Sequence, residues 1–203
     1  MPWIMKRLFL GIAPTQTQNT QLSTLQAGVS VDGKSVSPTN FHMTLAFLGQ
    51  LDIHQQFKLQ HKLDILHASK ALSWPKFTVT LDTLTLWRKT QILCLSGKVL
   101  DPNLQYILDE CHSLLQQIGI KLPHHQNIKT EQDPLSQEVN FVPHISLFRK
   151  AKRLPVKHQA LALTLSPEKL HLYASVSKPS GVEYQILQSW LLTEITDKKN
   201  AAD

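Results

Sequence analysis

Residues 39–49 read TNFHMTLAFLG, and residues 140–149 echo them as NFVPHISLFR. Both stretches contain a Phe, then a His, any residue, a hydroxyl residue and a Leu. Their apolar character favours strands, and side chains at positions i and i+2 of a strand leave the same face. Each copy therefore predicts an apolar strand that presents an imidazole beside a hydroxyl.

The first copy divides into two faces on this reading. His42 and Thr44 are expected on one face of the strand, and the other face takes Met43, Leu45 and Phe47. Gly49 is expected to end the strand.

The second copy divides in the same way. His144 and Ser146 are expected on one face and Ile145 and Leu147 on the other, with Phe148 on the face of His144. Two such strands opposite each other would bring two imidazoles and two hydroxyls to one site.

The bare tetrapeptide pattern is weak evidence, because the chain has ten histidines and many Ser, Thr and Leu residues. His67-Ala68-Ser69 begins in the same way but lies in a helical pattern, where i and i+2 do not face each other. A lone His on such a strand is usually a half-buried polar residue satisfied by its neighbours. The duplication within two strand patterns favours a functional pair.

The composition is that of a folded protein with a mild positive charge. The 203 residues are 42% hydrophobic, and 21 Lys and Arg against 15 Asp and Glu give a formal charge of +6. This charge favours anionic partners such as RNA, although many proteins are mildly basic. Two isolated cysteines, Cys94 and Cys111, predict buried free thiols in a reducing compartment.

Targeting signals are not expected. The apolar run from Leu8 to Ala13 is too short for a signal peptide, and no stretch approaches 18 continuous apolar residues. These features predict a cytoplasmic protein with no membrane contact.

Hydrophobic periodicity and turn residues predict a mixture of strands and helices without regular alternation, which favours an α+β fold with antiparallel sheets. In the helix capped by Asp52, the residues expected to face inward are Ile53, Phe57, Leu63 and Leu66. Strands are expected at 6–13, 77–82, 91–96, 169–176 and 183–192, helices at 15–29, 52–71 and 101–118, a loop at 32–40, and a long polar connection at 121–140.

Two histidines suit general acid and base catalysis, because imidazole titrates near neutrality. One neutral ring can accept a proton while a protonated one donates, as displacement of an oxygen at phosphorus requires. The hydroxyls of Thr44 and Ser146 would hydrogen-bond the non-bridging phosphate oxygens.

The sequence resembles the RNA 2′,3′-cyclic phosphodiesterases, also called 2′-5′ RNA ligases, of the two-histidine phosphoesterase superfamily. The resemblance rests on the paired signatures, with support from residues 7–12, 77–87 and 170–175. It implies two pseudo-symmetric lobes of antiparallel sheet backed by helices around a central cleft. Residues 1–196 would form this single domain, followed by a polar tail at 197–203.

The resemblance also implies a reaction. A 2′,3′-cyclic phosphate at an RNA end, for example on a tRNA fragment, would be hydrolysed to a 2′-phosphate, with reverse 2′-5′ ligation as a related activity. On this view His144 is the base that activates water, and His42 is the acid that protonates the departing 3′ oxygen. No metal and no cofactor are expected, since no carboxylate and histidine cluster has ligand spacing. The protein is expected to be a monomer.

Several positions differ from the family pattern or allow two readings. Val142 stands where relatives often carry a basic residue, and Ser146 stands where Thr is commoner. Arg149 is either a phosphate contact or a surface ion pair, because strand alternation alone turns it away from His144. Phe148 is either a base-stacking or a packing residue.

Features outside the two signatures leave similar alternatives. His124 and His125 on the long connection favour solvated side chains over ligands. The basic turn from Arg149 to Arg153 is either a guide for the RNA backbone or a solvated loop. Two other functions also remain open: a non-catalytic nucleotide or RNA binding module, and a phosphodiesterase for small esters such as ADP-ribose cyclic phosphate.

Overall fold

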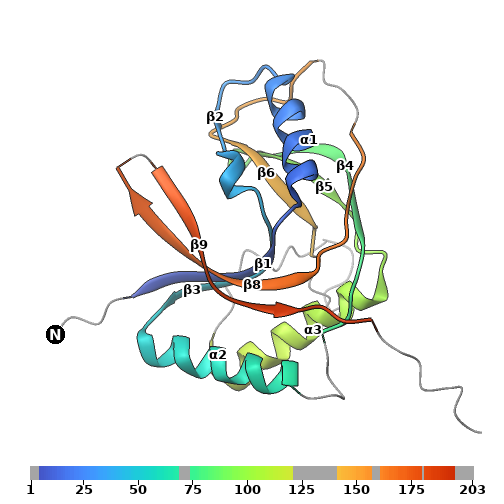
Figure 1. The fold of residues 1–203 in the computed structure, drawn as a ribbon. Helices are drawn as coiled ribbons and strands as arrows, with labels where there is room; N and C mark the ends of the chain where they lie inside the picture. The colour runs from blue at the N-terminus through green and yellow to red at the C-terminus, as the bar shows by residue number, and fades with distance from the viewer. Residues whose placement is uncertain (1–4, 69–73, 121–140, 157–160, 180, 195–203) are drawn as a thin grey trace, which may run out of the picture.

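The computed structural model describes residues 5–68, 74–120, 141–156, 161–179 and 181–194. Within them the chain forms two antiparallel sheets, and the predicted α+β class is confirmed (Figure 1). The four-stranded sheet has the order β3 (Met43–Leu51), β1 (Lys6–Ile12), β8 (Lys169–Lys178) and β9 (Gly181–Leu191). The five-stranded sheet has the order β2 (Lys34–Ser35), β6 (His144–Arg149), β5 (Ile92–Gly97), β4 (Val79–Trp87) and β7 (Leu163–Leu165).

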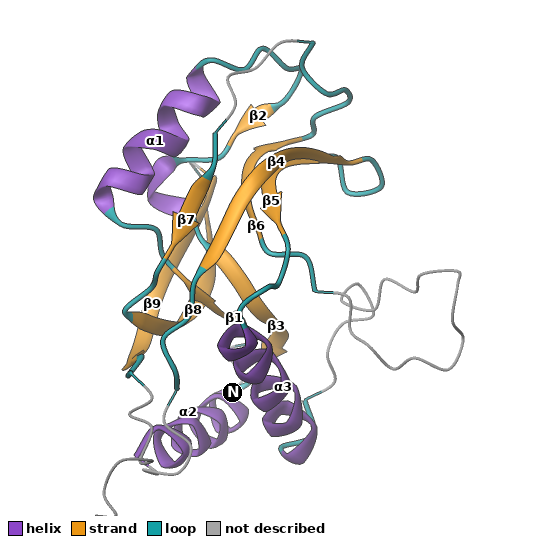
Figure 2. Ribbon diagram, turned by 90° about the vertical axis from the view of Figure 1, so that its right-hand side faces the viewer, coloured by secondary structure: helices purple, strands orange, loops and turns teal. Residues whose placement is uncertain are grey.

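Each sheet is backed by helices, which gives the two lobes expected from the resemblance. Helices α2 (Ile53–Ala68) and α3 (Pro102–Gln117) cover the four-stranded sheet, and α1 (Gln16–Ala27) covers the other (Figure 2). The α1 side chain of Gln26 donates hydrogen bonds to the carbonyl oxygens of Val36 and Leu147. Helix α1 follows β1 of the four-stranded sheet but packs on the five-stranded sheet. Helix α3 follows β5 of the five-stranded sheet but packs on the four-stranded sheet.

The helix ends follow the predicted capping chemistry. Asp101 accepts a hydrogen bond from the backbone N–H of Asn103, and Asp52 accepts one from that of Gln55. Gly119, two residues after α3, takes the left-handed backbone conformation with φ 75°. In α2 the predicted inward face was only partly right: Leu63 is buried, but Phe57 is 62% exposed. Leu59 and Gln56 take the buried positions instead.

The remaining predictions divide between confirmed strands and local corrections. Strands form in all five predicted regions, as β1, β4, β5, β8 and β9, although β4 begins at Val79 and continues to Trp87. Both cysteines are buried free thiols, as expected. Gly49 does not end β3, which continues to Leu51. The expected loop at 32–40 contains β2 and a short 3-10 helix, η1 (Pro38–Asn40), and β7 had not been predicted.

Some predictions fall outside the described residues: the connection at 121–140, the end of the second helix at 69–71 and the tail at 197–203. Among the helices of the described segments, none is both long enough and apolar enough to cross a membrane.

Candidate active site

The first histidine stretch enters β3 through a bulge that changes which side chains share a face. Thr44 pairs with Gly11 and Phe47 with Phe9, and Leu45 is skipped between them. Phe47 therefore lies on the face of Thr44, 39% exposed and 5.8 Å from Phe9 between ring centroids. The prediction that Phe47 faces the core beside Leu45 was wrong, because strict alternation does not continue through a bulge.

The second histidine stretch has a bulge at the corresponding place in β6. His144 pairs with Ser96 and Ser146 with Cys94, as alternation predicts, and Leu147 is then skipped. Arg149 pairs with Ile92, which shares a face of β5 with Cys94 and Ser96.

The bulge at Leu147 decides between the alternatives left open for Arg149 and Phe148. Arg149 returns to the face of His144 and Ser146. Phe148 turns to the opposite face and is only 7% exposed within the hydrophobic core. The expectation that Phe148 shares the face of His144 is therefore wrong, and of its two alternatives the structure favours the packing residue over the base-stacking one.

Both imidazoles are fixed in the same way by the backbone just before them. His42 Nδ1 lies 2.7 Å from the carbonyl oxygen of Asn40, and His144 Nδ1 lies 2.9 Å from that of Val142. A carbonyl oxygen only accepts hydrogen bonds, so each Nδ1 carries the proton and donates it. In the neutral rings each Nε2 is therefore an unprotonated acceptor, without a hydrogen-bond partner among the described residues.

Burial keeps both imidazoles neutral at pH 7. The pKa of His42 is lowered to about 4, mainly by loss of hydration and also by the positive charges of Arg149 and of protonated His144, against the hydrogen bond to Asn40. Burial likewise lowers the pKa of His144, against its hydrogen bond to Val142. The positive charges of Arg149 and of protonated His144 on β6 thus oppose the protonation of His42.

The two predicted hydroxyls lie beside the histidines and are free to bind a ligand. Thr44 and Ser146 are half-buried. In the part of the chain that the structure describes, neither hydroxyl forms a hydrogen bond. The faces of β3 and β6 that carry the histidines therefore offer four polar groups without hydrogen-bond partners among the described residues: two imidazole Nε2 atoms and two hydroxyls.

Aromatic rings surround His42 from three strands. Its ring centroid lies 4.7 Å from that of Phe9 on β1, 4.6 Å from Tyr184 on β9 and 6.0 Å from Tyr173 on β8. On the second sheet, Trp87 lies 4.3 Å from His144 between ring centroids. Sequence reasoning did not assign these rings to the site, because their proximity depends on strand pairing rather than on any local motif.

A polar contact joins the two lobes next to His42. Arg149 on β6 donates from Nη2 to the Tyr184 hydroxyl on β9 at 3.1 Å. The guanidinium stands beside an imidazole and an uncharged phenol, with no carboxylate among its described hydrogen-bond or ion-pair partners. It is therefore available to an anionic group, as a phosphate contact would require.

Other candidate sites are poorer matches to this chemistry. Among the described residues no group of three or more His, Cys, Asp or Glu side chains is arranged to hold a metal ion, and His124 and His125 lie outside those residues. A separate cavity of about 410 Å³ lies near the start of α3 and has a net negative lining, from Lys76, Asp101, Glu168 and Glu194. Such a lining repels a phosphate.

Comparison with known proteins agrees with the site. Residues 12–93 match the family model described as LigT like Phosphoesterase. The curated RNA 2′,3′-cyclic phosphodiesterase of Escherichia coli (strain K12) is 24% identical over 163 residues, which cover 80% of this chain and 81% of that protein.

The fold gives a stronger match than the sequence. The crystal structure of E. coli LigT complexed with 3′-AMP superposes with a TM-score of 0.74 at 24% identity, and the alignment covers 94% of this chain and 100% of that one. TT0787 of Thermus thermophilus gives a TM-score of 0.70 at 21% identity, with the same coverage. Residues 12–93 thus match the family model of the LigT-like phosphoesterases, and 94% of the chain shares the fold of the E. coli and T. thermophilus proteins.

Proposed function

We propose that the protein is an RNA 2′,3′-cyclic phosphodiesterase that uses His42 and His144 as its acid and base. The observation that carries this proposal is the matched state of the two rings: each Nδ1–H donates to a backbone carbonyl, and each Nε2 has no hydrogen-bond partner within the described segments. Two fixed imidazoles beside two free hydroxyls suit an in-line displacement at phosphorus. The names of the E. coli relatives support the same substrate class.

In the proposed reaction, His144 Nε2 accepts a proton from a water molecule whose oxygen attacks the phosphorus. The bond between phosphorus and O3′ breaks, and protonated His42 delivers its Nε2 proton to O3′. The product carries a 2′-phosphate and a 3′-hydroxyl, and solvent returns the protons. Thr44, Ser146 and Arg149 would hydrogen-bond the non-bridging oxygens and stabilise their charge.

The assignment of acid and base follows the surroundings of the rings. Arg149 makes the imidazolium of His42 harder to form and therefore a stronger acid once formed. A bound phosphate anion supplies the opposite charge that favours this protonated form. Without a ligand both rings are neutral at pH 7, which suits His144 as the base.

An RNA substrate is supported by the charge around the end of β6. Lys34 on β2 lies opposite Arg149 on the neighbouring strand β6, and Lys150 and Lys152 are exposed immediately after β6. Positive side chains at this place would attract the phosphates of a longer RNA. A small ester such as ADP-ribose cyclic phosphate lacks such a chain of phosphates, so the relative rates on the two substrates would distinguish them.

The proposal is tested by product analysis. The protein is incubated in EDTA, without ATP, with an oligoribonucleotide that ends in a 2′,3′-cyclic phosphate. We expect a 2′-phosphate end, and we expect His42→Ala and His144→Ala each to lower the rate at least about 100-fold, because each removes an obligatory proton transfer.

The matched control is His67→Ala, since His67 begins the same His-x-Ser pattern but lies on α2. It should retain wild-type activity. Equal rates for the wild type and both site variants would refute the proposed function. Tight binding of the RNA end without turnover would instead favour a binding module, and preference for ADP-ribose cyclic phosphate would favour the small-ester enzyme.

A further inference from the structure

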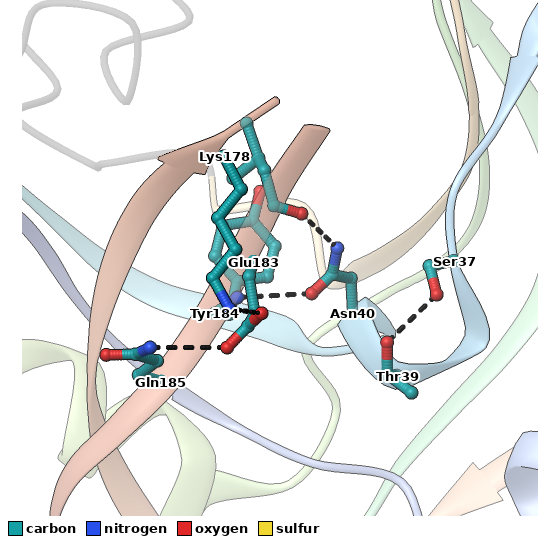
Figure 3. Close-up of polar contacts among 8 residues, drawn as sticks. Ser37, Thr39, Asn40, Lys178, Glu183, Tyr184 and Gln185 are labelled. Carbon is teal, nitrogen blue, oxygen red and sulfur yellow. Dashed lines mark hydrogen bonds and ion pairs between the residues drawn. The ribbon is translucent and has the colours of Figure 1, made fainter. Parts of the chain in front are cut away.

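The residue two positions before His42 forms hydrogen bonds to a distant strand. Asn40 Nδ2 donates to the carbonyl oxygen of Val182 at 2.7 Å, and its Oδ1 accepts from the backbone N–H of Tyr184 at 3.2 Å (Figure 3). Both groups belong to β9, so one carboxamide pairs with the strand edge as a neighbouring peptide group would. The short helix η1 and the hairpin β8–β9 are joined in this way.

The same residue also holds the imidazole. Its main-chain carbonyl accepts the Nδ1–H of His42 at 2.7 Å. Phe41, which lies between Asn40 and His42, is buried, so this short segment has little freedom to move independently. Through Asn40, the position of β9 therefore determines the position of the carbonyl oxygen that fixes the His42 tautomer.

The second histidine stretch is supported differently. Val142 stands at the position equivalent to Asn40, and its carbonyl accepts from His144 Nδ1. Its apolar side chain cannot form hydrogen bonds, and the segment is held instead by the backbone N–H of Gly97, which donates to the Pro143 carbonyl at 2.9 Å. Main-chain pairing with β5 supports the second copy, whereas a side chain supports the first.

The strand that Asn40 binds is also the strand that supplies Tyr184. The Tyr184 ring packs edge-on against His42, and its hydroxyl accepts from Arg149 of the other lobe. Asn40 consequently holds together two side chains of the site: the His42 ring, and Tyr184, whose ring packs on His42 and whose hydroxyl contacts Arg149.

We propose that Asn40 is a positioning residue that fixes the orientation and tautomer of His42 by anchoring it to β9. Its catalytic consequence rests on the proposed function, whereas its effect on the imidazole does not. Without the carboxamide, the loop from η1 to β3 loses its two bonds to β9. The Asn40 carbonyl would then no longer be held at His42 Nδ1, and the proton would exchange between Nδ1 and Nε2.

The test compares Asn40→Ala with Thr39→Ala. Thr39 is an exposed neighbour in η1, and its hydroxyl contacts only that of Ser37 among the described residues. Long-range ¹⁵N NMR of the imidazole reports the tautomer at pH 7.5, and steady-state kinetics on the cyclic-phosphate oligonucleotide report kcat and KM.

We expect a pure Nδ1–H tautomer of His42 in the wild type and in Thr39→Ala, and a mixture in Asn40→Ala. The kcat of Asn40→Ala should fall about 10-fold to 100-fold with KM changed less than about threefold, because misorientation of a reacting group acts on the transition state. A merely structural role would lower stability but leave the tautomer and kcat of the folded protein unchanged.

Asn40→Asp is the second variant, for the case that Asn40→Ala does not fold. It keeps the acceptor for Tyr184 N–H but loses the donor to the Val182 carbonyl, so we expect a tautomer mixture here too. A pure Nδ1–H tautomer in the folded Asn40 variants would overturn the inference, even where kcat falls. If the wild type does not hydrolyse the oligonucleotide, the proposed function fails, and the tautomers alone decide the role of Asn40.

Discussion

The state of His42 is set by two opposing requirements at a single residue. Burial against Phe9 and Tyr184 disfavours the charged ring, and the pKa falls to about 4. Catalysis as an acid requires the charged ring. An anionic phosphate bound between the histidines resolves this conflict, because it favours protonation only in the complex. Proton uptake is thereby tied to substrate binding.

The same burial predicts that the protein loses stability in mild acid. In the unfolded chain His42 has an ordinary pKa of 6.5. Between pH 6.5 and 4 it is therefore largely protonated in the unfolded chain and largely neutral in the folded protein. Stability therefore rises with pH in this window. Relative to pH 7.5, the contribution of His42 at pH 5 is a loss of about 2 kcal/mol of unfolding free energy.

Urea unfolding at pH 7.5 and pH 5 measures this loss. His42→Gln, which does not titrate, should reduce the difference between the two pH values by about 2 kcal/mol. His61→Ala is the comparison, since His61 is an exposed residue of α2. An unchanged pH difference in His42→Gln would show that folded His42 is readily protonated.

At the scale of the elements, the bulges at Leu45 and Leu147 decide what reaches the site. The sequence predicted both strands and the faces of His42, Thr44, His144 and Ser146, because alternation holds up to each bulge. Beyond the bulges, strict alternation assigned the wrong faces. After Thr44, apolar residues occupy both the odd and the even positions of the strand. The sequence therefore does not reveal where the pairing skips a residue.

Contacts from distant strands were also beyond sequence reasoning. Asn40 and Tyr184 are separated by 144 positions, and no local pattern relates them. Tyr173 and Trp87 likewise reach the site through strand register. Local chemistry identified the reacting groups, whereas the groups that hold them required the pairing of whole strands.

The irregular pairing of β4 with β5 leaves no space for a side chain at Gly97. A Cβ on Gly97 would lie 2.0 Å from the carbonyl oxygen of Thr80, a backbone atom that cannot rotate away. Gly97→Ala should therefore force the two strands apart and lower the unfolding free energy by about 2–3 kcal/mol. Urea denaturation measures the loss.

Gly28→Ala is the matched control. Its Cβ would meet only ordinary contacts at 3.5 Å or more, and its φ of −77° suits any residue. Its unfolding free energy should stay within about 0.5 kcal/mol of the wild type or rise slightly. Equal stability of the Gly97 and Gly28 variants would mean that the strands relax without cost.

At the scale of the whole molecule, the lobe that contains β6 acts on the histidine of the other lobe. Helices α1 and α3 pack on sheets opposite to the strands that precede them, which interlocks the two halves of the chain. Strand β6 of the second lobe then brings Arg149 to Tyr184 and His42 of the first. The site is therefore electrostatically one unit even though its two histidine stretches lie in separate sheets.

This coupling predicts a measurable effect across the lobes. After burial and the charge of His144, the guanidinium of Arg149 is a further cause of the low pKa of His42. Arg149→Gln removes that charge, so the pKa of His42 should rise toward its ordinary value of 6.5. Inorganic phosphate should bind at least about 10-fold more weakly, because a charged hydrogen-bond donor is lost.

NMR titration of the His42 ring and of phosphate binding tests both effects. Arg153→Gln is the control, because Arg153 is exposed, lies four residues further on and pairs with Asp32 at 3.1 Å. It should leave the pKa of His42 and the affinity for phosphate unchanged. If Arg149→Gln behaves like Arg153→Gln, Arg149 acts only as a surface cation and the two lobes are electrostatically independent. A rise in the pKa together with weaker phosphate binding would establish that the second lobe controls the proton on the first.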